Sequence, residues 1–186
     1  MTQNNRPAIS PFTPAHQEAI IDPQRLQDRI PAHVLQQITP LSLQAFIVDS
    51  EASDTRVFCE RYGYPPASCA NTLILKFKKN GLEAYAAAVS TGAQRLDING
   101  AIKQLLAAQR ISFARTERST ELTGMVPGGI TVFGLPADWP LLIDNQVLRQ
   151  PVLIMGGGTR EVKLLVPSSV LAALPNVLTG DLALPD

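Results

Sequence analysis

The dipeptide Asn80-Gly81 constrains the fold of this chain more than any other feature of its sequence. It separates two apolar runs, at 71–78 and 84–90, and Asn-Gly is the dipeptide that most favours a two-residue β-hairpin turn. The pattern therefore predicts an antiparallel pair of strands near the middle of the chain, and the other elements must be arranged around that pair.

Short apolar segments alternate with helical ones on both sides of the hairpin. Further strands are expected at 45–48, 111–114, 130–133, 141–143, 152–155 and 162–166. Helices are expected at 53–62, capped by Ser53 or Asp54 and ended by Gly63, then after Asp97, from Thr116, and after Ser168 or Ser169. Hairpins mixed with helices indicate an α+β fold with a mixed sheet, and not a regular doubly wound fold.

The length of 186 residues fits one domain preceded by an arm. Residues 1–40 hold six prolines, which remove backbone donors and block helix interiors. This segment is therefore expected to be a proline-rich arm with at most two short helices between Pro14 and Gln37. It is expected to pack onto the domain at 41–186 through Ile20, Ile21, Leu26, Ile30 and Val34.

Composition and charge exclude several classes of protein. The 16 basic and 16 acidic residues give zero net charge, which argues against binding of DNA or other long nucleic acid. Zero net charge does not exclude binding of a short single-stranded end. No apolar run approaches the roughly 18 residues of a membrane span, and no apolar leader follows Met1. Two cysteines, Cys59 and Cys69, do not make a disulfide framework, so a reduced cytoplasmic protein without membrane contact is expected.

The sequence shows no side-chain nucleophile with a recognisable base. There is no G-x-S-x-G elbow and no phosphate-binding loop, and Gly156-Gly157-Gly158 lacks the third glycine of the dinucleotide fingerprint because Glu161 stands there. Both histidines, His16 and His33, fall in the arm. Two cysteines ten residues apart with no nearby histidine do not make a zinc pattern, so neither a metal nor a cofactor is expected.

The glycine-rich segment 124–134 is the most informative stretch for function. Glycines let backbone N–H groups come close to a ligand, and an array of such donors holds a carbonyl or phosphate oxygen without a charged side chain. A tight turn before a strand would use the same residues, and spacing alone does not separate these two interpretations.

Glu121-Leu122-Thr123-Gly124 leads into Gly128-Gly129-Ile130-Thr131 around this segment. These residues resemble the signature of the YbaK/EbsC family, the editing domain that also occurs within or beside prolyl-tRNA synthetase. The resemblance extends over about residues 45–175. Further similar stretches are 71–75, 89–90 with 95–97, 141–144, 156–158 and 164–167. The fold that this resemblance implies is α+β, a mixed and largely antiparallel barrel-like sheet with interspersed helices.

The resemblance implies a freestanding aminoacyl-tRNA deacylase, a carboxylic ester hydrolase that removes a wrong amino acid from the acceptor end of a tRNA. In such enzymes the backbone of the glycine loop holds the aminoacyl carbonyl, and a water or a ribose hydroxyl of the substrate does the chemistry. The catalytic residues that it implies are Asn71, Gly128, Gly129 and Thr131. The substrate-binding residues that it implies are Phe46, Pro127, Asp144, Gly157, Gly158 and Arg95.

Position 71 departs from the family pattern, because the family has a lysine there and this chain has Asn71. Lysine supplies a cation to a phosphate or a developing oxyanion, whereas asparagine supplies only a dipole. Lys76 does not replace it, since side chains alternate along a strand. Lys76 would share the wetter face with Thr72 and Ile74, opposite a core-facing row at 71, 73, 75 and 77.

Two functions therefore stay open. One is an active deacylase with tRNA as its partner, in which Arg95 or Lys103 either meets acceptor-stem phosphates or simply faces solvent. The other is a weak or inactive paralogue that binds an aminoacyl-like ligand or an aminoacyl-tRNA synthetase. In either case Asn71, Thr131 and Asp144 are expected to converge on one cavity.

Overall fold

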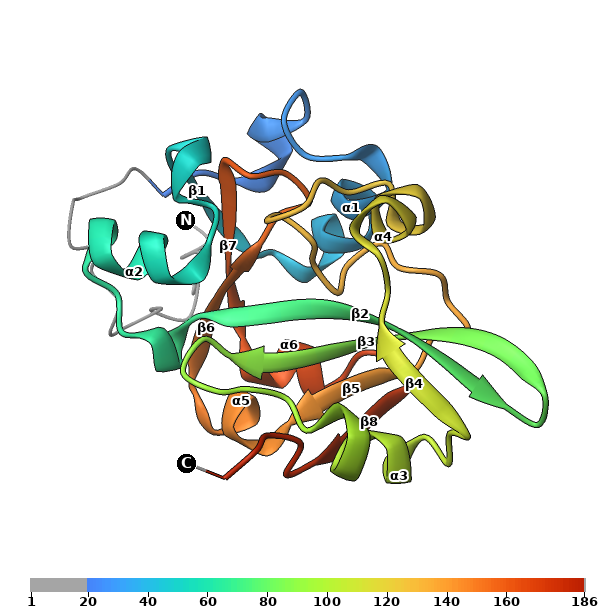
Figure 1. The fold of residues 1–186 in the computed structure, drawn as a ribbon. Helices are drawn as coiled ribbons and strands as arrows, with labels where there is room; N and C mark the ends of the chain where they lie inside the picture. The colour runs from blue at the N-terminus through green and yellow to red at the C-terminus, as the bar shows by residue number, and fades with distance from the viewer. Residues whose placement is uncertain (1–19, 186) are drawn as a thin grey trace.

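A computed structural model describes residues 20–185 of the chain as two β-sheets surrounded by helices (Figure 1). The five-stranded sheet has the order β4-β2-β3-β5-β8. Its strands are β2 Ala70–Lys79, β3 Leu82–Thr91, β4 Arg110–Phe113, β5 Leu141–Asp144 and β8 Val177–Gly180. The three-stranded sheet has the order β1-β7-β6, and its strands are β1 Gln44–Ile47, β6 Val152–Gly156 and β7 Val162–Pro167.

The helices are short and lie at the ends and outer faces of the two sheets (Figure 1). They are α1 Ala32–Ile38, α2 Thr55–Tyr62, α3 Lys103–Leu105, α4 Thr116–Thr123, α5 Asn145–Arg149 and α6 Ser168–Ala172. Single 3-10 turns occur at Pro23–Leu26, Thr39–Leu41, Ser50–Ala52 and Pro66–Ser68, and a π-turn at Ile98–Ile102 precedes α3. Within residues 20–185 no helix combines the length and the apolar character that crossing a membrane requires.

The expected α+β class is confirmed, and the expected barrel needs a correction. The pairs β2–β3, β2–β4, β1–β7 and β6–β7 are antiparallel, while β3–β5 and β5–β8 are parallel. The strands form two sheets that share a core but, within residues 20–185, are joined by β-bridge pairing only between Cys69 and Ile154, so they do not close into one barrel.

The hairpin at the middle of the chain is confirmed in detail. β2 and β3 pair without interruption from Ala70–Thr91 to Lys79–Leu82. Asn80 and Gly81 both have positive φ, 50° and 79°, as a type I′ turn requires. Two other local signals are also confirmed, because the Asp54 side chain accepts hydrogen bonds from the first turn of α2 and Gly63 ends that helix with φ of 73°.

The strand expected at 130–133 is wrong, because this stretch forms turns. Its residues Val132 and Phe133 are fully buried, which explains the strand-like pattern. The backbone is instead held by the arm, since the Gly134 amide donates to the Gln37 side chain. Gly128 and Gly134, with φ of 84° and 77°, bend the chain at both ends of the stretch.

Three features near the C-terminus differ from expectation. The sequence did not predict α5 or β8. α5 has only five residues, and its one signal in the sequence is its N-cap Asp144, whose side chain accepts a hydrogen bond from the Gln146 amide. α6 forms where expected, but its N-cap is Pro167 and neither Ser168 nor Ser169 supplies a cap.

The faces of β2 also differ from the expected alternation of core and solvent. Thr72 and Ile74 are buried, whereas Leu73 is 38% exposed. The reason is that β2 is covered on both faces. Ile74 belongs to the core shared with β6 and β7, and Leu75 and Phe77 belong to a second core under the π-turn and α3.

The described part of the arm, residues 20–40, packs on the domain. Leu26, Ile30 and Val34 are buried in the main core as expected, whereas Ile20 is exposed. Ile21 exchanges backbone hydrogen bonds of 2.7 and 2.9 Å with Ala45 and so covers the edge of the three-stranded sheet. The rest of the arm, with His16, lies outside the described residues.

Candidate functional site

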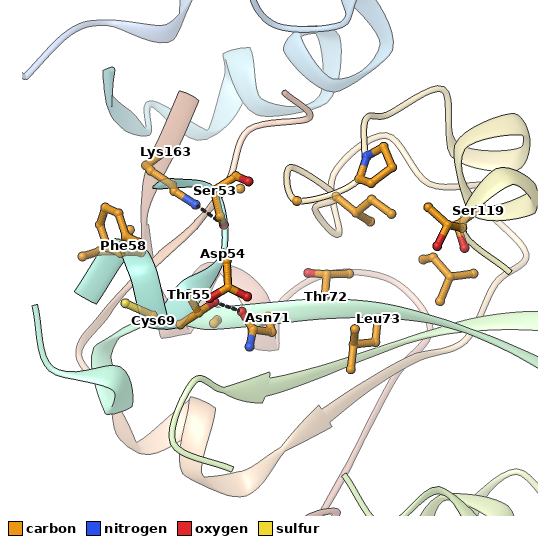
Figure 2. A pocket seen from close by; sticks show the side chains of 18 of the residues that line it. Ser53, Asp54, Thr55, Phe58, Cys69, Asn71, Thr72, Leu73, Ser119 and Lys163 are labelled. Atoms are coloured by element: carbon orange, nitrogen blue, oxygen red, sulfur yellow. Dashed lines mark hydrogen bonds between the residues drawn. The ribbon is translucent and has the colours of Figure 1, made fainter. Parts of the chain in front are cut away.

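A cavity of about 390 Å³ lies between the two sheets, below the glycine-rich loop. It is bounded by the start of α2, the first half of β2, the end of β4 with α4, the glycine-rich loop, and the ends of β6 and β7 (Figure 2). The polar or charged side chains on its wall are Ser53, Asp54, Thr55, Asn71, Thr72, Thr116, Ser119 and Lys163. Of the stretches that carry the resemblance, 71–75, the glycine-rich segment and 156–158 contribute residues to this wall, whereas 89–90, 95–97, 141–144 and 164–167 do not.

Asn71 stands on the cavity wall, as expected. Its side-chain oxygen accepts a hydrogen bond from the Thr55 hydroxyl on the first turn of α2 (Figure 2). Asp54 next to Thr55 caps α2 by accepting from the amides of Arg56 and Val57 at 3.0 and 3.2 Å. The start of α2 thereby fixes the orientation of Asn71, whose amide nitrogen makes no hydrogen bond within residues 20–185.

The glycine loop contributes Pro127, Gly128 and Ile130 to the cavity, but not Gly129. Gly129 is buried, its N–H donates to the Val126 carbonyl at 3.0 Å, and its own carbonyl accepts from Gly158 N–H at 2.7 Å. The Gly129 amide is therefore already used within the loop, and the expected role of Gly129 in binding the aminoacyl carbonyl stays a prediction. The amides of Gly128 and Ile130, by contrast, donate to no group in the described part of the chain.

Gly157 and Gly158 lie behind this loop, and not on an opposite wall of the cavity. A Cβ at Gly129 would be 2.4 Å from the Thr159 carbonyl, and a Cβ at Gly156 would be 2.7 Å from the Gly129 oxygen. The segment 156–159 is thus a support against which the glycine loop rests at backbone contact. Only Gly156 of the three glycines reaches the cavity.

Thr131 and Asp144 do not converge with Asn71, so that expectation is wrong. Thr131 is fully buried behind the loop, and its amide donates to the Met125 sulfur at 3.4 Å. Asp144 is 1% exposed and accepts hydrogen bonds from the Gln94 side chain and from the Gln146 and Leu182 amides, at 3.1, 2.8 and 2.7 Å. Its carboxylate is satisfied by the fold and ties β5 to α5 and to the C-terminal segment.

Two further residues expected to bind substrate lie away from the cavity. Phe46 is fully buried and packs behind Phe58, with 6.4 Å between ring centroids, so it supports the wall without forming it. Arg95 is exposed on the loop after β3, and its carbonyl accepts from the Leu184 amide. A contact between Arg95 and tRNA phosphates stays a prediction.

Lys163 is the residue that the sequence analysis missed. It projects from β7 into the cavity toward Ser53, with Nζ 3.5 Å from the Ser53 carbonyl oxygen and 5.0 Å from the centroid of the Phe58 ring (Figure 2). The residue is only 7% exposed, and burial lowers the pKa of its ammonium below the ordinary lysine value. A lone cation inside the apolar stretch Val162–Pro167 was the signal that could have identified it.

Cys59 and Cys69 meet beside Lys163, with 3.6 Å between their sulfur atoms. Burial raises the pKa of both thiols, more strongly at Cys69, so neither is a ready thiolate nucleophile. His33 is not near them: it bonds the Thr123 carbonyl through Nε2 at 2.7 Å. Within residues 20–185 no group of three or more histidine, cysteine or acidic side chains is placed to hold a metal ion.

Residues 49–174 match the family model of the aminoacyl-tRNA editing domain. The chain belongs to this family. No curated protein sequence matches it.

Among solved structures, the editing domain is similar to a candidate trans-editing enzyme for prolyl-tRNA synthetase, with a TM-score of 0.71, 20% identity, and coverage of 82% of this chain and 96% of the other. It is also similar to the hypothetical protein APE2540, with a TM-score of 0.72, 24% identity, and coverage of 82% and 99%. These similarities confirm the fold.

Proposed function

We propose that this editing domain hydrolyses, in trans, the ester that joins a wrong amino acid to the 3′ end of a tRNA. The observation that carries the proposal is the cavity, which is lined by Asn71 and by Gly128 and Ile130, two residues whose amides donate to no group within residues 20–185. Family membership supplies the class of substrate, and the cavity supplies donors for its carbonyl. Such a protein would act in the cytoplasm, in contact with the acceptor end of tRNA and with a synthetase.

The wall of the cavity favours a mechanism without a covalent intermediate. Ser53, Ser119 and Cys69 are present, but no histidine lies on the described wall to activate them, and burial raises the pKa of the Cys69 thiol. A water molecule, oriented by the neighbouring ribose hydroxyl of the substrate, then attacks the ester carbon. The protein's part is to orient the carbonyl and to stabilise its developing charge.

The mouth of the cavity suits the terminal adenosine of a tRNA. Phe113 at the end of β4 is 50% exposed, and Leu73 beside it on β2 is 38% exposed, yet both line the cavity. An exposed aromatic ring offers a stacking surface for a base. The amino acid would then enter the cavity, while the base stays at its rim.

A comparison of variants at Asn71 and Thr55 tests the proposal. Asn71→Ala should lower the kcat for deacylation of mischarged tRNA about tenfold or more, since it removes a polar group from the reacting centre. Thr55→Val removes only the hydrogen bond that orients Asn71, and should have a smaller effect. Both proteins should unfold at nearly the temperature of the wild type.

The competing function, a paralogue that only binds its ligand, predicts a different result for the same assay. The wild type would then be inert on every mischarged tRNA, and Asn71→Lys would create activity by restoring a cation at that position. Such a result would reject the deacylase proposal.

A further inference from the structure

We propose that the ammonium of Lys163 donates a hydrogen bond to the carbonyl oxygen of the bound aminoacyl ester and stabilises the negative charge that this oxygen acquires during hydrolysis. The inference rests on the proposed function and adds to it a catalytic residue outside the motifs of the resemblance.

The first observation is that Lys163 is buried without a counter-ion. Its Nζ lies beyond ion-pairing distance of every carboxylate in the described part of the chain. One long bond to the Ser53 carbonyl and the face of Phe58 are its neighbours. An ammonium has three donors, so at least two of them are left for a ligand.

The second observation is that the same cavity holds another unsatisfied polar group. Thr72 lines the cavity and is only 8% exposed, and its buried hydroxyl has no hydrogen-bond partner within residues 20–185. Burying an unpaired hydroxyl and an unpaired cation is costly, and an apolar side chain at either site would avoid the cost. Both are explained together when the occupant of the cavity brings oxygen acceptors.

The third observation links Lys163 to the glycine loop. Lys163 stands opposite Gly156 in the β6–β7 register, and Gly156 is in contact with the Gly129 carbonyl above it. Ser53, whose carbonyl oxygen faces Nζ, has its hydroxyl next to Gly128, at 2.7 Å from a Cβ built there. The Lys163 ammonium and Gly128 are therefore both next to Ser53, and both residues line the same cavity.

The chemical step is an ordinary ester hydrolysis. A water oxygen adds to the carbonyl carbon, and the carbonyl oxygen becomes an oxyanion held by Lys163 and the loop amides. The carbon–oxygen bond to the ribose then breaks, the proton of the attacking water ends on the ribose oxygen, and free amino acid and tRNA leave. Lys163 stays protonated throughout and transfers no proton.

Lys163→Met tests this role, because methionine fills a similar volume without the charge. On the tRNA that the wild type deacylates best, kcat should fall about 100-fold or more, as it does when a donor to an oxyanion is removed, and KM should change little. Lys76→Met is the matched control: Lys76 is exposed, pairs with Glu83 at 2.6 Å and lies outside the cavity, so its removal should leave kcat within a factor of two.

The pH profile separates a catalytic role from a structural one. Lys163 acts only when protonated, so the enzyme-catalysed rate, after subtraction of spontaneous hydrolysis, should fall as pH rises through the lowered pKa of Lys163. The titratable groups around Nζ are Asp54, Cys59 and Cys69, and the variant keeps all three side chains; loss of the Lys163 cation raises the pKa of the two thiols further. The high-pH limb should be missing from the residual activity of Lys163→Met and retained in Lys76→Met.

Binding of a stable amide analogue, 3′-deoxy-3′-(alanylamino)adenosine, gives a readout that does not need turnover. Titration calorimetry should show at least tenfold weaker binding to Lys163→Met than to the wild type. If the wild type is active and Lys163→Met keeps both its kcat and its affinity for the analogue, the inference about Lys163 is wrong, while the proposed function stands. A wild type that binds the analogue through Lys163 but hydrolyses no ester overturns the proposed function and the catalytic role of Lys163, and confirms only the hydrogen bond of Lys163 to the carbonyl oxygen. Absence of analogue binding to the wild type overturns the inference.

Discussion

The contact between the glycine loop and its support makes Gly129→Ala the most informative single change for the architecture of the site. Gly129 does not need a positive φ, so a methyl group acts there purely by volume. A Cβ at this position would lie 2.4 Å from the carbonyl carbon and oxygen of Thr159 and 2.8 Å from its Cα, where 3.4 Å is an ordinary contact. Because these are backbone atoms, no side chain can rotate away, and the loop must move by about 1 Å.

The size of the effect follows from what that movement breaks. It separates the Gly158 N–H from the Gly129 carbonyl and the Val126 N–H from the Gly158 carbonyl, bonds of 2.7 and 3.1 Å. Each is worth about 1 kcal/mol, and overpacking adds about 1–3 kcal/mol, so Gly129→Ala should lower the free energy of unfolding by about 3–5 kcal/mol. For a chain of this length that is a fall in Tm of about 6–20 °C.

Gly81→Ala is the matched control. Gly81 has φ of 79° in the hairpin turn and no atom within 4 Å of a Cβ built on it, so alanine there costs only the left-handed conformation, about 1–2 kcal/mol. Urea unfolding followed by the fluorescence of Trp139, which is the single tryptophan of the chain and buried, measures both variants. Equal destabilisation by the two substitutions would refute the claim that the loop rests on Thr159 at backbone contact.

Three further predictions concern residues around the site. Asp144→Ala should lower the free energy of unfolding by about 2–4 kcal/mol, because it leaves buried donors unpaired. The KM of the folded enzyme should stay unchanged. A raised KM with normal stability would instead show that Asp144 contacts the substrate. Phe113→Ala should raise KM for mischarged tRNA about fivefold or more at constant kcat and Tm, whereas Leu82→Ala at the exposed hairpin end should not. Iodoacetamide at pH 8 should alkylate Cys69 more slowly than Cys59, and both cysteines more slowly than the thiol of glutathione. The reason is that burial raises the pKa of the two thiols and so reduces their thiolate fraction. Mass spectrometry of peptides measures the rates.

The parts of the fold that the sequence predicts correctly are those set by local chemistry. Asn80-Gly81 needs only its own backbone preferences to turn the chain, and Asp54 and Gly63 start and end α2 through neighbours a few residues away. The prediction of a strand at 130–133 fails because the backbone just after it, at the Gly134 amide, bonds the side chain of Gln37, almost a hundred positions earlier. A pattern of burial does not reveal whether the covering partner is a strand or an arm.

The candidate site divides in the same way. Asn71, Pro127 and Gly128 line the cavity as the motifs indicate. The polar groups of Gly129 and Asp144 instead form hydrogen bonds within the fold, among them bonds to Gly158 and Leu182. The sequence shows that a residue carries a donor or acceptor, but only the fold shows whether that group is already used. Lys163 is the converse, a cation in an apolar strand whose missing partner becomes visible only in three dimensions.

The central claim, that this cavity hydrolyses aminoacyl esters of tRNA, is tested most directly by release of labelled amino acid from a panel of correctly and wrongly charged tRNAs. The panel should include alanyl- and cysteinyl-tRNA for proline, with the purified, folded wild type as enzyme. We predict saturable hydrolysis of at least one wrongly charged tRNA and sparing of the correctly charged one. Rates equal to spontaneous hydrolysis across the whole panel, with protein shown to be folded by its Trp139 fluorescence, would contradict the account.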